Sequence, residues 1–153
     1  MMLLALLLFA RTITASGDWV AYDRGSSCEA VTRSLLVPKQ GEPQPHVALS
    51  FDRARGRNGE LSVALRRASR AGSTVVLIIG DQPFLLSARG AAAWSRGPVQ
   101  EQAIITAMRS AGGMRVEARD AAGRRTVDRY VLNGAPTAID AAAAACSRRF
   151  ARP

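Results

Sequence analysis

The feature that most restricts how this chain can fold is a pair of cysteines, Cys28 and Cys146, placed near opposite ends of the sequence. An even number of cysteines in a chain with a secretory leader favours a disulfide. In the chain-entropy account, a bond that closes so long a loop stabilises the fold by about 5 kcal/mol. Two buried thiols are the alternative. We expect neither a zinc site nor a redox centre, because the chain has one histidine and no Cys-x-x-Cys motif.

The leader is a short apolar run over residues 3–10. A membrane-spanning helix needs about 20 such residues, whereas a signal peptide needs about 7–15 of them followed by small residues. Residues 14–17 are small, so we expect a signal peptide over residues 1–17, cleaved after Ser16 or Gly17. No Lys or Arg precedes the run, and an uncleaved anchor is the alternative. The signal peptide predicts a periplasmic or secreted protein without a stable transmembrane anchor.

The remainder of the chain has the composition of one folded domain. Apolar residues make up 48% of the sequence and aromatic residues only 5%, so the core must consist mainly of Val, Leu, Ile and Ala. We expect a single domain over residues 18–148, followed by a basic tail over residues 149–153.

Alternation of apolar and polar residues, which is typical of half-buried strands, runs through most of this domain. The expected strands are residues 19–22, 28–37, 46–51, 61–65, 74–79, 84–88, 114–119 and 126–132. Two segments have helical spacing instead. Residues 98–111 begin at a proline and end at Gly112, and residues 136–146 carry Ile139 and Cys146 on one face. The pattern predicts a mainly β protein: a compact antiparallel sandwich or barrel-like domain with one or two edge helices and a disulfide.

The charge balance is strongly basic, at +9, and Lys39 is the only lysine. A general preference for arginine on a solvated surface explains this balance without any partner. The functional alternative is an anionic partner, such as a polysaccharide or lipid headgroups. The candidate residues for its binding lie in two basic loops: Arg53, Arg55, Arg57, Arg66, Arg67 and Arg70. Aromatic residues do not alternate with these arginines as they do in single-stranded nucleic-acid sites, so we expect no nucleic-acid partner.

The sequence contains no recognisable catalytic or metal-binding motif. His46 lies on an expected strand and is interpreted as a surface residue, because no nucleophile motif accompanies it. The carboxylates are dispersed, and we expect no metal, no cofactor and no enzymatic activity. A hydrolase that uses two carboxylates meeting across a sheet is an alternative. Trp19 and Trp94 are interpreted as core anchors, with a ligand groove as the alternative, and Asp128 is interpreted as one half of a cross-strand ion pair.

Several local motifs follow one another after the leader, at residues 17–20, 28–30, 79–86, 93–94, 104–109, 113–116, 128–134 and 138–140. Their order resembles that of the invasion-associated locus B family of exported bacterial proteins. The resemblance covers about residues 17–147 and is strongest in the C-terminal half. The basic stretch over residues 53–57 and the Pro/Gln-rich loop before it do not match the family pattern.

The resemblance implies a mostly β, sandwich-like envelope protein without a known enzymatic activity. It also implies that Cys28 and Cys146 form the bridge, and that Trp19, Trp94 and Gly134 belong to the scaffold. Founding members of the family are linked to host-cell entry, but the family is also broad in free-living bacteria, so a host role does not transfer directly. The leading hypothesis is a non-catalytic envelope protein with an envelope or host-surface partner. A binding module for anionic surface ligands and an unrecognised hydrolase are the alternatives.

Overall fold

The computed structural model describes residues 10–148 of the chain. Most of the leader's apolar run and the expected basic tail lie outside the described residues. The strands are β1 (Arg11–Ser16), β2 (Trp19–Asp23), β3 (Cys28–Arg33), β4 (His46–Asp52), β5 (Arg57–Ala64), β6 (Val75–Ile79), β7 (Gln82–Arg89), β8 (Ala92–Trp94), β9 (Gly113–Arg119) and β10 (Arg125–Val131). The helices are α1 (Pro98–Ser110) and α2 (Ala135–Arg148), with a short 3-10 turn, η1 (Arg53–Arg55).

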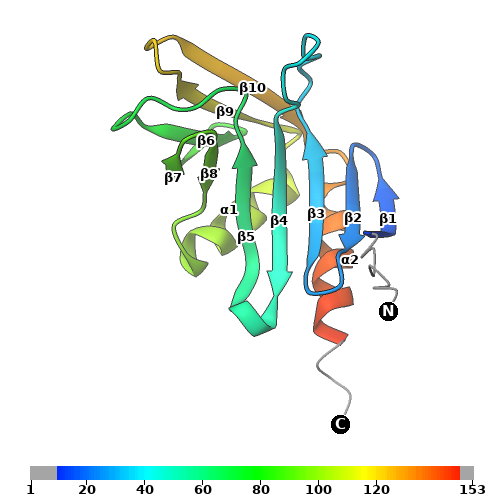
Figure 1. Ribbon diagram of the computed structural model, residues 1–153. Coiled ribbons are helices and arrows are strands. Elements are labelled where there is room, and N and C mark those ends of the chain that lie inside the picture. The colour runs from blue at the N-terminus through cyan, green and yellow to red at the C-terminus, as the bar shows by residue number, and fades with distance from the viewer. Residues whose placement is uncertain (1–9, 149–153) are drawn as a thin grey trace, which may run out of the picture.

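All strands join one antiparallel sheet in the order β1-β2-β3-β4-β5-β8-β7-β6-β9-β10. The first part of β7 pairs with β6 and its last three residues pair with β8, so β7 links two parts of the sheet. In Figure 1, β1–β5 stand side by side while β9 and β10 lie across one end. The sheet is not closed. The predicted mainly β, antiparallel and sandwich-like fold is confirmed.

The core follows directly from the alternation in the sequence. Val47, Leu49 and Phe51 on β4 point to the same side as Leu61 and Val63 on β5, and all five are buried. Burial of each such side chain contributes about 1.5–3 kcal/mol. The opposite side of these strands, which we call the open face, has no helix packed on it among the described elements, although Ala48, Ser50 and Asp52 of β4 are also buried there.

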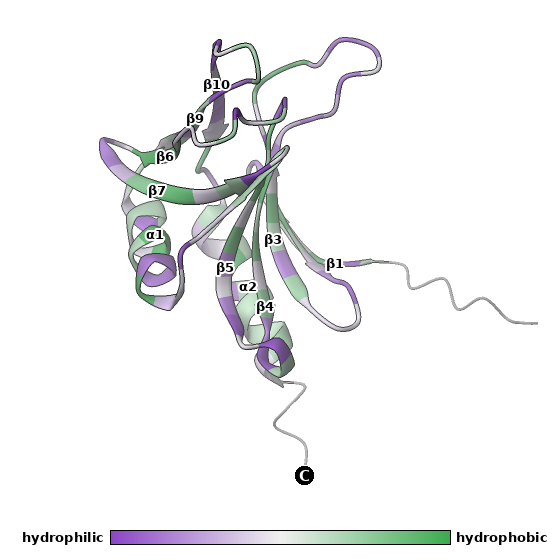
Figure 2. Cartoon of the chain, turned by 60° about the vertical axis from the view of Figure 1, so that its left-hand side comes forward, coloured by the Kyte–Doolittle hydropathy of each residue, from purple (hydrophilic) through white to green (hydrophobic). Residues whose placement is uncertain are grey.

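The two helices cover the core side of the sheet. Helix α2 packs against β1–β4 and helix α1 packs mainly against β5, with further contacts to β6 and β7. Figure 2 shows both helices on the same side of β3–β5. A disulfide joins Cys28, at the start of β3, to Cys146, near the end of α2, with 5.7 Å between the Cα atoms. Both cysteines are buried, so the bond ties the C-terminal helix to the sheet that it covers.

The sheet begins inside the segment that the sequence assigned to the leader. Strand β1 pairs with β2 on both sides of an irregularity at Ile13, and Ile13 packs against the core. Removal of residues 1–17 therefore takes away the edge strand of the sheet, whereas cleavage before Arg11 keeps it. The sequence did not predict β1 or the three-residue strand β8, so the sheet has ten strands where eight were expected.

A close backbone approach fixes the β1–β2 turn against the turn between β10 and α2. Gly134 has a φ of +90°, and a Cβ atom built there would lie 1.8 Å from the carbonyl oxygen of Ser16. The amide of Asp18 donates a hydrogen bond to the carbonyl of Asn133 at 3.0 Å. Only glycine combines this backbone conformation with this contact, which gives Gly134 the scaffold role that the family resemblance implied.

Replacement of Gly134 by alanine tests whether the mature protein keeps β1. In protein that begins at Arg11, we expect Gly134→Ala to lower the free energy of unfolding by about 1–3 kcal/mol or more, from backbone strain and the clash with Ser16. In protein that begins at Asp18, the clash is absent and we expect a clearly smaller loss. Urea unfolding of both lengths measures the difference. Equal losses would mean that β1 does not lie against Gly134.

Candidate anion-binding surface

Three turns that are far apart in the sequence meet at one end of the molecule. They are the loop of residues 65–74 after β5, the β7–β8 turn at Gly90, and the β9–β10 turn. Both the amide and the hydroxyl of Ser69 donate to the carbonyl of Gly90, at 2.8 and 3.1 Å. The amide of Arg70 donates to the carbonyl of Arg119 at 2.8 Å. These bonds hold the three turns together as one surface.

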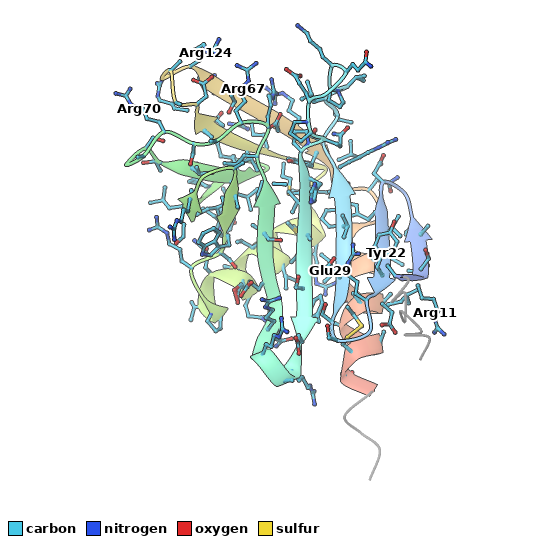
Figure 3. The ribbon with its side chains drawn as sticks, viewed as in Figure 1. Arg11, Tyr22, Glu29, Arg67, Arg70 and Arg124 are labelled. Atoms are coloured by element: carbon cyan, nitrogen blue, oxygen red, sulfur yellow. A yellow bond between two sulfur atoms is a disulfide. The ribbon has the colours of Figure 1, made fainter. Side chains whose placement is uncertain are left out.

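Arginines from all three turns are exposed on this surface, which we call the arginine end. They are Arg67, Arg70, Arg89, Arg119 and Arg124. Figure 3 labels three of them, which lie at the end of the molecule beyond β7 and β9. Guanidinium groups present planar pairs of N–H donors that match the oxygens of phosphate, sulfate and carboxylate groups. The cluster therefore has the chemistry of a surface that binds anions.

One buried carboxylate organises the arginine end. Oδ1 of Asp120 accepts hydrogen bonds from the amides of Ala122 and Arg124, at 3.0 and 2.9 Å. Its Oδ2 accepts from Nε of Arg124 at 3.0 Å and lies 3.5 Å from Nη1 of Arg67. Asp120 thus fixes the tight β9–β10 turn and places two guanidinium groups side by side, while leaving much of each exposed.

The other arginines of the cluster have fewer carboxylate partners than Arg67 and Arg124. Nη1 of Arg119 donates to the carbonyl of Gly123 at 3.0 Å, and no carboxylate in the described part of the chain pairs with this guanidinium. Among residues 10–148, no hydrogen bond or ion pair is found for the Arg70 guanidinium. Glu42 adds a second carboxylate near the cluster, 3.9 Å from Arg67. Positive charge is therefore in clear excess at the arginine end.

The surroundings of Asp120 keep it ionised. Its burial acts to raise the pKa of the carboxyl, but the amide, the charge and the side chain of Arg124 together lower that pKa below its ordinary value. Since the folded-state pKa is the lower one, ionised Asp120 stabilises the fold above the ordinary carboxyl pKa, and this stabilisation is lost as the pH falls through the folded-state value.

Comparison with Asp120→Asn measures this pH dependence. We expect wild type to have the larger free energy of unfolding at neutral pH, with a constant advantage down to about pH 5 and a shrinking one below it. Urea unfolding of both proteins at several pH values tests this. An advantage that grows as the pH falls would contradict the assigned role of Asp120.

The six arginines expected to bind an anionic partner do not form one site. Arg67 and Arg70 belong to the arginine end, but Arg53, Arg55 and Arg57 lie at the opposite end of the β4–β5 hairpin. The two basic loops are therefore separate surfaces, because the turn and the open end of a hairpin of this length lie about 20 Å apart.

Arg66 is held within the structure instead. Its Nε donates to Oδ1 of Asp128 at 3.0 Å, and its Nη2 donates to the carbonyl of Val127 at 3.1 Å. Asp128 is buried, so Arg66 neutralises a charge that would otherwise be costly. The expected ion pair of Asp128 exists, but its partner comes from the end of β5; the residue directly opposite on β9 is Val116.

Carboxylates lie close to the arginines in and beside the η1 turn. Arg55 and Arg57 pair with Asp52 and Glu60, each at 3.6 Å. A shallow cavity of about 340 Å³ lies between this turn and the end of α2. Arg53 and Arg57 line it together with Asp52, Asp140 and other residues. Because carboxylates balance the arginines there, the η1 turn is a weaker anion site than the arginine end.

A larger groove of about 730 Å³ lies on the open face of β2 and β3, beneath the loop that follows β3. Its lining includes Val20, Tyr22 and Val31, together with Asp18 and Arg33. The two charged residues have opposite signs, so this groove does not select an anion.

Two of the three remaining candidate residues lie where the sequence predicted them, and the third does not. Trp19 is fully buried, and its Nε1 donates to the carbonyl of Val131 at 3.0 Å, as expected for a core anchor. His46 is exposed, as expected. Trp94 is 38% exposed on β8, so its interpretation as a core anchor is wrong. Its neighbour Ala93 takes the buried position, because successive strand residues point to opposite faces.

Sequence reasoning missed Arg89, Arg119 and Arg124 as members of the surface. Two of them sit beside glycines, as Arg89-Gly90 and Gly123-Arg124, and such pairs mark the ends of hairpins. The hairpins were recognisable. What brings their turns together is the strand order, in which β8 and β7 separate β5 from β6.

No protein-family model, curated protein or solved structure matches this chain. The family resemblance therefore remains a prediction. Over the residues that the structure describes, no helix is long and apolar enough to cross a membrane. The same residues contain no group of three or more His, Cys, Asp or Glu side chains that could hold a metal ion.

Proposed function

We propose that this chain is an exported, non-catalytic protein of the bacterial envelope, periplasmic or secreted, which binds an anionic partner through the arginine end. The observation that carries the proposal is that Arg67, Arg70, Arg119 and Arg124 lie on turns that are bonded to one another, with Arg67 and Arg124 both on the buried carboxylate of Asp120. Separate turns supply these arginines, and backbone hydrogen bonds hold the turns together.

Two features support export. The apolar leader has the length of a signal peptide. The disulfide between Cys28 and Cys146 is a bond that persists in oxidising compartments outside the cytoplasm. The resemblance to the invasion-associated locus B family points to the same compartment.

A binding role suits the site better than catalysis does. The hydroxyl of Ser95 donates to Oε2 of Glu101 at 2.8 Å, which is the described buried pairing most similar to catalytic groups. That hydroxyl also accepts a hydrogen bond from the amide of Leu61 at 3.1 Å, and no histidine accompanies Ser95 and Glu101. We therefore assign Ser95 and Glu101 to the packing of α1 against β5 and give the chain no enzymatic activity.

The proposal predicts arginine-dependent, salt-sensitive binding. We expect oxidised protein to bind dextran sulfate at low salt and to lose about tenfold or more in affinity between about 50 mM and 300 mM NaCl, because exposed charges are screened. The triple variant Arg67→Gln/Arg70→Gln/Arg124→Gln should bind much more weakly. Titration calorimetry measures both effects.

The chain offers a control with the same change in net charge. The variant Arg53→Gln/Arg55→Gln/Arg57→Gln removes three arginines from the opposite end of the β4–β5 hairpin and should bind nearly as well as wild type. Arg70→Gln alone breaks no described side-chain interaction and should weaken binding without lowering the melting temperature. Equal losses in the two triple variants would show that only net charge matters, and would overturn the assignment of the site.

A further inference from the structure

An apolar patch lies on the open face of the sheet beside the arginine end. Leu85 on β7 is 48% exposed, and Trp94 on β8 is 38% exposed. Strand alternation places Leu85, Ser87 and Arg89 on one face of β7, and Trp94 lies directly opposite Ser87. The large apolar side chains and Arg89 therefore project from the same face.

The first turn of α1 lies beside this part of β7. Nε2 of Gln100 donates to the carbonyl of Leu85 at 2.8 Å, and this bond holds the start of the helix against β7. Val99, next to Gln100, is 88% exposed. The sequences of β7 and β8 contain no Asp or Glu. This surface thus combines exposed apolar groups with positive charge and has no acidic group on either strand.

The apolar patch is continuous with the arginine end. Arg89 belongs to both, since it shares a face with Leu85 and directly precedes Gly90. Gly90 in turn accepts the two hydrogen bonds from Ser69, the residue before Arg70. A flat partner that contacts Trp94 and Leu85 can therefore contact Arg89 and Arg70 at the same time.

We infer that this combined surface docks on a bilayer that contains anionic lipids. Arginines near an anionic membrane surface are attracted to the headgroup phosphates. Tryptophan, with an apolar body and a polar N–H, is the side chain that favours the interface between headgroups and acyl chains. The inference rests on the proposed anion binding and adds the lipid surface as the partner. A water-soluble polyanion would account for the exposed arginines, but it would offer no apolar surface for the exposed Leu85 and Trp94.

Vesicle binding followed by tryptophan fluorescence tests this inference. The probe is phosphatidylcholine vesicles with and without phosphatidylglycerol, added to the full oxidised protein. Trp19 is fully buried, so a change in emission reports on Trp94. We expect a blue shift only with phosphatidylglycerol, and about a fivefold loss of partitioning for each arginine removed from the arginine end.

Apolar insertion is tested by Leu85→Ser/Trp94→Ser, with partitioning measured by sedimentation of the vesicles. We expect a loss of about tenfold or more relative to wild type. The matched control is Leu35→Ser/Val37→Ser, which removes two exposed apolar residues from the loop after β3 and should partition like wild type. Melting temperatures of both variants show whether they are folded.

The outcomes separate the two proposals. Arginine-dependent binding to dextran sulfate without binding to phosphatidylglycerol vesicles would overturn the lipid inference and leave the anion-binding function intact. Vesicle binding that is equal in wild type and Leu85→Ser/Trp94→Ser would also overturn it, because the apolar patch would then have no part in docking. Binding to neither probe would overturn both proposals.

Discussion

Reduction of the Cys28–Cys146 bond is expected to lower the free energy of unfolding by about 5 kcal/mol, the value that the chain-entropy account gives for a loop of this size. The sequence separation is 118 residues, so the bond restricts nearly the whole unfolded domain. A loss of this size is comparable with the total stability of many small domains. Urea unfolding with and without a reductant that reaches the buried bond measures the effect.

The double variant Cys28→Ala/Cys146→Ala provides the control for this prediction. It should resemble the reduced wild type in stability, and the reductant should leave its unfolding curve unchanged. If oxidised and reduced wild type unfold at the same urea concentration, the bond is absent or does not contribute to stability.

Replacement of Trp19 by alanine is expected to have the second largest effect, a loss of about 3–5 kcal/mol. Trp19 is fully buried at the start of β2, where it fills the space between the sheet and α2. Its hydrogen bond to the carbonyl of Val131 also links β2 to the end of β10. The substitution therefore removes core volume and leaves a partly buried carbonyl without that donor.

Trp94 provides a control of the same residue type. Because its side chain is partly exposed on the open face, Trp94→Ala should cost much less stability than Trp19→Ala. Urea unfolding of the two single variants gives the comparison. Similar losses would contradict the assignment of Trp19 to the core and of Trp94 to the surface.

The sequence predicted most strands and both helices, because burial of one face of an element spaces its apolar residues regularly along the chain. The expected strand over residues 46–51 lies within β4, and the expected helix over residues 98–111 differs from α1 by one residue. Cys146 faces the core, as the helical spacing predicted. Strand β3 is shorter than expected, because the backbone leaves the ladder after Arg33 although the alternation continues.

Two strands were missed for physical reasons. Strand β1 overlaps the expected leader, and its small residues suit a signal cleavage site and an edge strand equally well. Strand β8 has three residues and an Ala-rich sequence, which carries no periodic signal. Without β8, nothing in the sequence placed Trp94 on an exposed strand.

The binding surface was only partly predictable. Adjacent arginines such as Arg66 and Arg67 look alike in sequence, but one pairs with buried Asp128 and the other is exposed near Asp120. That difference depends on a strand distant in the chain. Local charge density also favoured the η1 turn, where carboxylates within three residues balance Arg55 and Arg57.

Intact mass analysis after cell fractionation tests in one experiment whether the chain is exported, as proposed, and whether its two cysteines are joined. The protein should be isolated from its native cells with free thiols alkylated at lysis. We expect envelope or secreted protein that lacks the leader, carries no alkyl groups and gains two only after reduction. The measured mass also distinguishes cleavage before Arg11 from cleavage after Ser16 or Gly17. Cytoplasmic protein that keeps residues 1–17 and has both thiols alkylated would contradict both the proposed export and the disulfide.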